Sequence, residues 1–156
     1  MAAAFAASGC GEAKSGLGDE AVTLDSLLTV AEAYVGDTMT LRGIAATDCC
    51  DGALYVTDSA CTNKIRIAST APDFCSVAEN GQAVCVRGVI REDRVTRDEL
   101  ASKAAEADSL RRSGAISEEM CERVQNAIAA KKAYMDFTRR DYYSEFYIQG
   151  TSIEAE

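Results

Sequence analysis

Apolar and polar residues alternate along short segments of the first half of the chain and follow a helical period in the second half. Residues 38–46, 53–57, 64–68 and 82–90 are β-rich runs bounded by turn signals such as Asn80-Gly81. The polar loop between the second and third runs predicts a hairpin. Ahead of them, Thr23 is an N-cap candidate for a short amphipathic helix that ends near Gly36.

The helical period begins after Val95. Thr96 and Glu99 have the spacing of a capping box, which predicts a helix that runs toward Arg112. Ser117 is the expected N-cap of a second helix, and residues 145–150 predict a fifth strand that ends near Ile153. We expect the apolar stripe of the second helix to pack on the sheet; the stripe comprises Met120, Val124, Ala127, Ile128 and Met135.

The first and fourth strands share a pattern. Residues 36–44 and 81–89 both read as Gly, two residues, apolar, small, apolar, Arg, Gly, apolar. A glycine inside a strand commonly marks a bend or a bulge, which a small curled barrel needs. We therefore expect both strands to bend, at Gly43 and at Gly88.

The order of these elements predicts a mainly β protein with a helical insertion. Five strands, arranged as a meander of three followed by a fourth and a C-terminal fifth, match the OB-fold, which binds oligonucleotides and oligosaccharides in many proteins. The expected fold is a five-stranded OB-fold-like barrel with two helices between strands four and five.

Residues 23–153 resemble small OB-fold lipoproteins of the Bacteroidetes cell envelope. Three segments carry the resemblance: Val35-Gly36-Asp37-Thr38 before strand one, residues 81–88 in strand four, and residues 141–150 at the last strand. The resemblance implies a fold and a compartment and implies no activity. Those proteins tend to carry a His beside the Cys that follows strand one, whereas this chain has Asp48-Cys49-Cys50-Asp51.

The N-terminal residues indicate export. Residues 1–10 are uncharged and mostly small, and Ala7-Ser8-Gly9-Cys10 resembles a lipobox, in which the cysteine is lipidated. We interpret residues 1–10 as a truncated lipoprotein signal, 11–22 as a flexible tether and 23–156 as the OB-like domain. An alanine-rich leader with an incidental cysteine is the alternative. No other segment is apolar enough to span a membrane, so the expected attachment to the bacterial cell envelope, on the periplasmic or outer-membrane side, is through lipid.

Cysteine is abundant and histidine is absent. The seven cysteines leave six after Cys10. In an oxidising compartment these six are candidates for disulfides, with a thiolate metal site or a redox centre as the alternatives and a buried free thiol as a further one for Cys85. The candidates are Cys49, Cys50, Cys61, Cys75, Cys85 and Cys121.

The composition argues for a binding protein. Without His, the chain can form neither a Ser-His-Asp nor a Cys-His catalytic centre, so we expect a non-catalytic protein without a cofactor. The net charge of −9 disfavours nucleic acid, and an envelope protein, a glycan or a small ligand is the expected partner. A candidate ligand face, alternatively made of ordinary outward strand residues, comprises Arg42, Tyr55, Lys64, Arg66 and Arg87.

Overall fold

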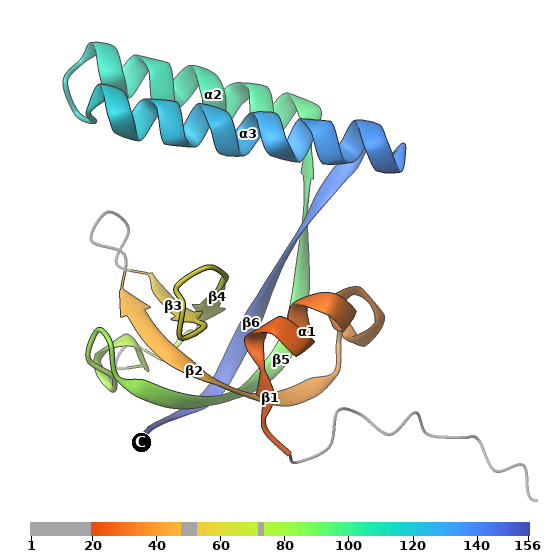
Figure 1. The fold of residues 1–156 in the computed structure, drawn as a ribbon, viewed down its shortest axis with the longest axis vertical. Helices are drawn as coiled ribbons and strands as arrows, with labels where there is room; N and C mark the ends of the chain where they lie inside the picture. Colours follow the sequence, from red (N-terminus) through yellow and green to blue (C-terminus); the bar gives the residue numbers. More distant parts are fainter. Residues whose placement is uncertain (1–19, 48–52, 72–73) are drawn as a thin grey trace, which may run out of the picture.

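A mixed sheet closes into a five-stranded β-barrel, from which a pair of long helices projects (Figure 1). The structure, a computed structural model, describes residues 20–47, 53–71 and 74–156, and for Cys75 it describes the backbone alone. The strands are β1 (Val22–Thr23), β2 (Thr38–Thr47), β3 (Leu54–Thr57), β4 (Lys64–Ala68), β5 (Ala83–Thr96) and β6 (Tyr142–Ala155). The helices are α1 (Leu24–Val30), α2 (Arg97–Arg112) and α3 (Glu118–Thr138), with short 3-10 helices at Ala31–Tyr34 and Phe74–Ser76.

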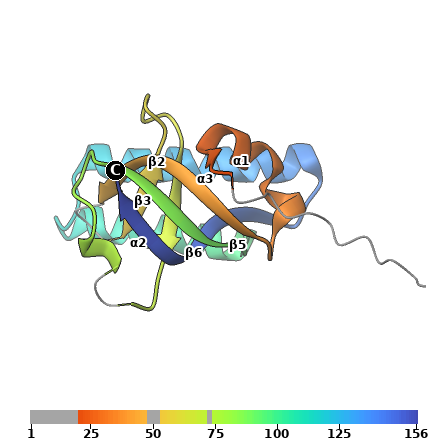
Figure 2. The ribbon, with the colours of Figure 1, turned by 90° about the horizontal axis from the view of Figure 1, so that it is seen from below.

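The barrel closes through β2, which changes partner along its length. Residues 38–44 of β2 pair with β5, and residues 44–47 pair with β3. The circuit continues from β3 to β4, from β4 to β6 in parallel, and from β6 back to β5. Figure 2 shows β2, β5 and β6 side by side in the wall of the barrel. The short β1 adds to β2 in parallel.

Gly43 and Gly88, the second glycine in each copy of the repeated pattern, lie where neighbouring strands approach closely. The register of β5 against β6 shifts between Arg87 and Gly88, so the expected irregularity at Gly88 is confirmed. A Cβ added at Gly88 would lie 2.4 Å from the Gln149 carbonyl oxygen. At Gly43, where β2 passes from β5 to β3, an added Cβ would lie 2.4 Å from Val56 Cγ1. Glycine therefore permits the close approach of neighbouring strands at both positions.

Alternating side chains from every barrel strand fill one core. On β5, Val84, Val86 and Ile90 are fully buried while Arg87 is exposed, as a half-buried strand requires. Helix α1 covers one end of this core with Leu24 and Leu27. The remaining large members are Met39, Leu41, Leu54, Val56, Ile65, Ile67, Phe74 and Ile148.

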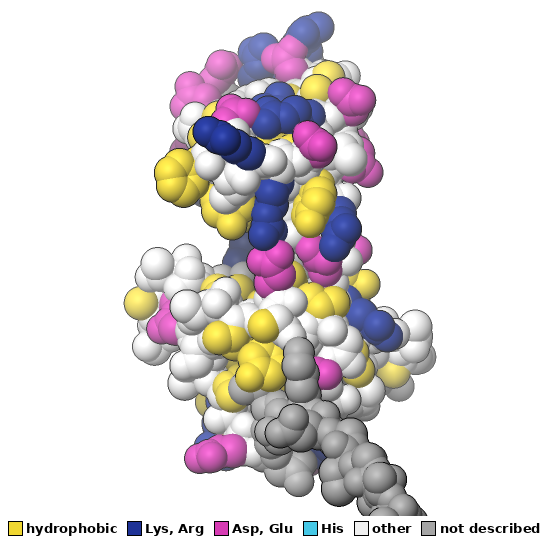
Figure 3. Space-filling model, turned by 90° about the vertical axis from the view of Figure 1, so that its right-hand side faces the viewer, with side chains coloured by type: hydrophobic (Ala, Val, Ile, Leu, Met, Phe, Trp, Pro, Cys, Tyr) yellow, Lys and Arg dark blue, Asp and Glu magenta, His cyan; other side chains and the backbone are white. Residues whose placement is uncertain are grey.

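Beyond the barrel, β5 and β6 continue as a two-stranded ribbon that carries the helices. Residues 91–96 pair with residues 142–147, and α2 and α3 follow side by side at the end of the ribbon (Figure 1). In the space-filling view the molecule narrows between the barrel and the helices, and basic and acidic side chains lie together at that waist (Figure 3). Both strands are longer than the sequence analysis predicts. For β5 the reason is that the charged run 91–94 lacks the apolar alternation of a strand that faces a core.

The helical caps are as predicted at two of three positions. Thr96 and Glu99 form the capping box at the start of α2, and the Ser117 hydroxyl accepts a hydrogen bond from the Met120 amide. Thr23 occupies the N-cap position of α1, but its hydroxyl donates to Ser26 Oγ and caps no backbone amide.

The apolar stripe of α3 packs differently from our prediction. Ile128 and Met135 are buried in a second, smaller core with Val95 of β5 and Leu100 of α2, and Val124 packs against it. Helix α3 therefore packs chiefly on α2 and on the end of the ribbon that carries the helices, and not on the barrel wall. Met120 and Ala127 are exposed, because a two-helix hairpin buries a narrower stripe than a helix lying on a sheet.

Candidate ligand-binding groove

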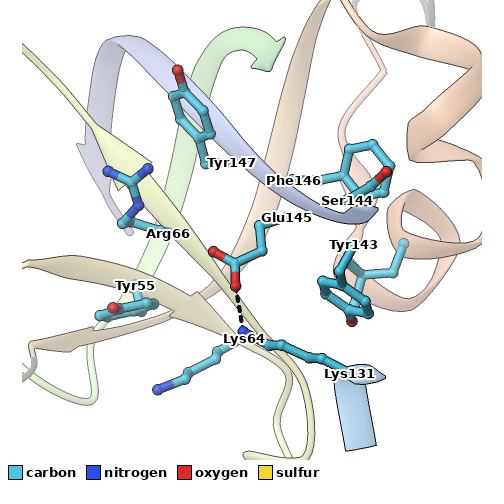
Figure 4. Close-up of a pocket in the computed structure, with 10 residues that line it drawn as sticks. Tyr55, Lys64, Arg66, Lys131, Tyr143, Ser144, Glu145, Phe146 and Tyr147 are labelled. Carbon is cyan, nitrogen blue, oxygen red and sulfur yellow. Dashed lines mark hydrogen bonds and ion pairs between the residues drawn. The ribbon is translucent and has the colours of Figure 1, made fainter. Parts of the chain in front are cut away.

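A cavity of about 420 Å³ lies where the barrel, the ribbon and α3 meet (Figure 4). The β3–β4 hairpin forms one wall, β6 forms another, and α3 contributes Lys131. We call this cavity the groove. Its described lining residues are Leu28, Tyr55, Lys64, Arg66, Lys131, Tyr143, Ser144, Glu145, Phe146 and Tyr147.

Strand pairing places the side chains of the barrel wall. Tyr55 of β3 lies opposite Arg66 of β4, and Arg66 lies opposite Tyr147 of β6. Three neighbouring strands therefore present Tyr55, Arg66 and Tyr147 in one row. Lys64 lies two residues before Arg66, so it points to the same face of β4.

Each cation of the groove is packed against a tyrosine ring. Lys64 Nζ lies 4.6 Å from the centroid of Tyr55, and the Arg66 guanidinium carbon lies 4.5 Å from that of Tyr147. Lys131 Nζ lies 5.4 Å from the centroid of Tyr143. Such contacts hold the stems of long side chains in place while the charge stays accessible. The groove thus offers positive charge beside aromatic surface.

The positive charge of the groove is only partly neutralised. Of the described lining residues, Lys64, Arg66 and Lys131 are cationic and Glu145 alone is acidic. Glu145 pairs with Lys131, as the dashed line in Figure 4 marks, and Arg66 also contacts Asp93 Oδ2 at 3.2 Å. No ion pair joins Lys64 to any residue in the described part of the chain. This excess of positive charge contrasts with the net −9 of the whole chain.

A partly buried carboxylate, that of Glu92, supports the wall of the groove at β6. Ser144 Oγ donates a hydrogen bond of 2.6 Å to Glu92, which also contacts Arg94 Nε at 3.2 Å. These partners, Ser144 first, hold the pKa of Glu92 below its ordinary value. The Glu92 side chain is 13% exposed, and the contacts with Ser144 and Arg94 compensate for the water that it has lost. The interaction ties β5 to β6 beside the groove.

The predicted ligand face is divided by the structure. Tyr55, Lys64 and Arg66 lie together in the groove, but Arg42 pairs with Glu156 at 3.0 Å and lines a separate cavity of about 280 Å³. Arg87 is exposed on β5 and does not line the groove. The predicted ligand face lacks Lys131 and Glu145. It also lacks Tyr143 and Tyr147, because an aromatic cluster at the last strand more often packs against the core than binds a ligand.

The cysteines that the structure describes are separate free thiols. Cys61 is exposed in the β3–β4 loop with φ of 53°, Cys85 is partly buried on β5, and Cys121 is buried on α3. Cys10, Cys49 and Cys50 lie outside the described residues, as does the Cys75 side chain. Within residues 20–47, 53–71 and 74–156, no group of three or more Cys, Asp or Glu is placed to hold a metal ion. Disulfide pairing therefore stays a prediction.

The site and fold define a β-barrel protein with a projecting helical hairpin and a cationic, tyrosine-lined groove between them. No protein-family model matches the chain, and no curated protein matches it either. Among the described helices, none has the length and apolar character needed to cross a bilayer.

Proposed function

We propose that this protein is a non-catalytic binding module that captures an anionic ligand in the groove. The observation that carries the proposal is the packing of Lys64, Arg66 and Lys131 on three tyrosine rings beside one carboxylate. Cations held in this way bind anionic groups with little loss of side-chain entropy, and the rings add contact area for the rest of the ligand.

We further propose that the barrel is an OB-fold. The circuit β2-β3-β4-β6-β5-β2, with a parallel β4–β6 pair, supports this assignment. In OB-folds the ligand lies over strands two and three and between the loops that follow strands one and four. Here β3 and β4 correspond to strands two and three, and the α2–α3 hairpin corresponds to the loop that follows strand four. The groove therefore coincides with the customary ligand position of that fold.

The proposed setting is the bacterial cell envelope, with a lipid on Cys10 as the anchor. The support is in the residues before Cys10 and in the resemblance to envelope lipoproteins, both read from the sequence. The intact mass of protein purified from the envelope tests this setting. An acylated N-terminal cysteine is expected, and a mass without acyl groups would refute the anchor; the same spectrum with and without reductant counts disulfides.

Tyrosine fluorescence tests the groove directly. The chain has six Tyr and no Trp, and three of these tyrosines line the groove, so tyrosine emission reports on ligand binding there. Titration with hexaglutamate, trigalacturonate and tetrathymidylate should give saturable binding of at least one of these anions. We expect Arg66→Ala and Lys64→Ala each to weaken that binding about three- to tenfold.

A matched control removes a cation elsewhere. Arg123→Ala deletes an exposed arginine of α3 that pairs with Glu119 and does not line the groove. This variant should bind as the parent protein does. Equal weakening by Arg123→Ala and Arg66→Ala would show that the affinity reflects overall charge, and the proposed site would be wrong. Absence of saturable binding by all three anions would also refute it.

A further inference from the structure

The groove runs along an open strand edge. Five consecutive residues of β6, 143–147, line it. Successive side chains of a strand point to opposite faces, so a cavity lined by all five runs along the edge of the strand and not over one face. The groove therefore gives access to the backbone of β6 as well as to its side chains.

The structure describes no partner for this edge of β6 beyond the barrel. β4 pairs with β6 at residues 147–149, and no described strand pairs with residues 142–146 on the side away from β5. In an antiparallel pair, alternate residues direct their N–H and C=O groups away from the partner strand. Residues 142–146 thus hold backbone donors and acceptors toward the groove, over about 16 Å of strand.

We infer that the ligand of the groove is an extended acidic peptide segment of a partner protein, which adds as a strand to residues 142–146 of β6. This inference rests on the proposed function. Its backbone would pair with the open edge, as in other cases of strand addition. Its carboxylates would meet Lys64, Arg66 and Lys131, which lie in walls on both sides of that edge.

The positive charge of the groove and the open edge of β6 together favour a peptide over other anionic ligands. An anionic glycan could satisfy the cations, but it lacks the regular N–H and C=O groups that pair with a strand edge. A nucleic acid carries a charge at every phosphate and would meet the acidic remainder of the chain, including Asp93 beside Arg66. A second cavity lies along residues 93–95 of β5, but acidic residues outnumber basic ones in its described lining, which comprises Asp93, Arg94, Val95, Asp98, Glu99, Ser102, Lys103 and Glu145.

Backbone methylation separates strand addition from simple charge attraction. The probe is a capped hexapeptide of alternating Glu and Thr, compared with the same peptide N-methylated at its central amides and with trigalacturonate, which carries the same number of carboxylates. Methylation retains the charge and removes the backbone donors. We expect it to weaken binding at least about tenfold. Amide hydrogen exchange of residues 142–146 should slow at alternate positions when the unmethylated peptide binds.

The outcomes distinguish this inference from the proposal on which it rests. Equal binding of the methylated and the unmethylated peptide, with no change of exchange at residues 142–146, would overturn strand addition and leave an anion-binding groove. If tetrathymidylate bound more tightly than the peptide, the ligand would be identified as a nucleic acid and the inference of a peptide ligand would be overturned. If Arg66→Ala weakened the binding of none of the probes, both the inference and the proposed function would be overturned.

Discussion

Replacing Gly88 by alanine should destabilise the barrel more than any comparable change at an exposed turn glycine. The added Cβ would lie 2.4 Å from the Gln149 carbonyl oxygen, 2.6 Å from Ile148 Cγ2 and 2.9 Å from the Gln149 carbonyl carbon. Two of these three atoms are backbone, which a rotamer change cannot move. The strands β5 and β6 would have to separate at the register shift between Arg87 and Gly88.

The magnitude follows from the rigidity of those neighbours. Overpacking a well-packed interior costs about 1–3 kcal/mol, and contact with backbone places Gly88→Ala near the upper value. The matched control is Gly114→Ala in the α2–α3 turn, where nothing lies within 4 Å of the added Cβ and φ is +77°. That change should cost about 1 kcal/mol, from the left-handed backbone alone.

Urea unfolding followed by far-ultraviolet circular dichroism measures both costs under one set of conditions. The expected result is a lower midpoint for Gly88→Ala than for Gly114→Ala, with similar slopes. A thermal scan should show a fall in Tm of about 6–12 °C for Gly88→Ala. A cost for Gly88→Ala that equals or falls below that of Gly114→Ala would refute the close approach of β5 and β6 at this position.

Three further changes test the ribbon, the hairpin and the groove. Ser144→Ala should raise the pKa of Glu92, because it removes the hydrogen bond that lowers this pKa. At pH values above the ordinary Glu pKa of 4.5, the variant should be less stable than the parent by about 1 kcal/mol. Urea unfolding at a series of pH values should show this difference vanish as the pH falls through the lowered folded-state pKa. Met135→Ala, at a fully buried position, should cost about 2–5 kcal/mol and increase amide exchange in α2 and α3. Glu145→Gln should raise the affinity for hexaglutamate, measured by tyrosine fluorescence, because it removes the groove carboxylate.

Local signals account for the parts of the fold that the sequence predicts. The Thr96–Glu99 capping box and the Asn80-Gly81 turn are set by neighbouring residues, so they appear in the sequence as they do in the structure. The ribbon was not predictable in the same way. Residues 91–94 pair with β6, but all four are charged and Glu92 alone of them is partly buried, so no alternation of apolar residues marks the strand.

The groove was predicted in part for a similar reason. Tyr55, Lys64 and Arg66 belong to one hairpin, and local pairing brings them together. Lys131 and Glu145 lie beside this hairpin only because β6 returns next to β4 after the helical hairpin, and no local pattern records that return. Alternation along β2 and β5 shows that Arg42 and Arg87 point outward, but it does not show which sector of the barrel wall they occupy.

The α2–α3 hairpin leaves and re-enters the barrel through two adjacent strands. A segment joined in this way can be lengthened, shortened or exchanged as a cassette without breaking the β2-β3-β4-β6-β5 circuit. Lys131, however, reaches from α3 into the groove, and Tyr134 makes an edge contact with Tyr143 at 5.6 Å between ring centroids. Exchange of the cassette would therefore alter the groove while conserving the barrel, so the chemistry of the groove can diverge in evolution on an unchanged scaffold.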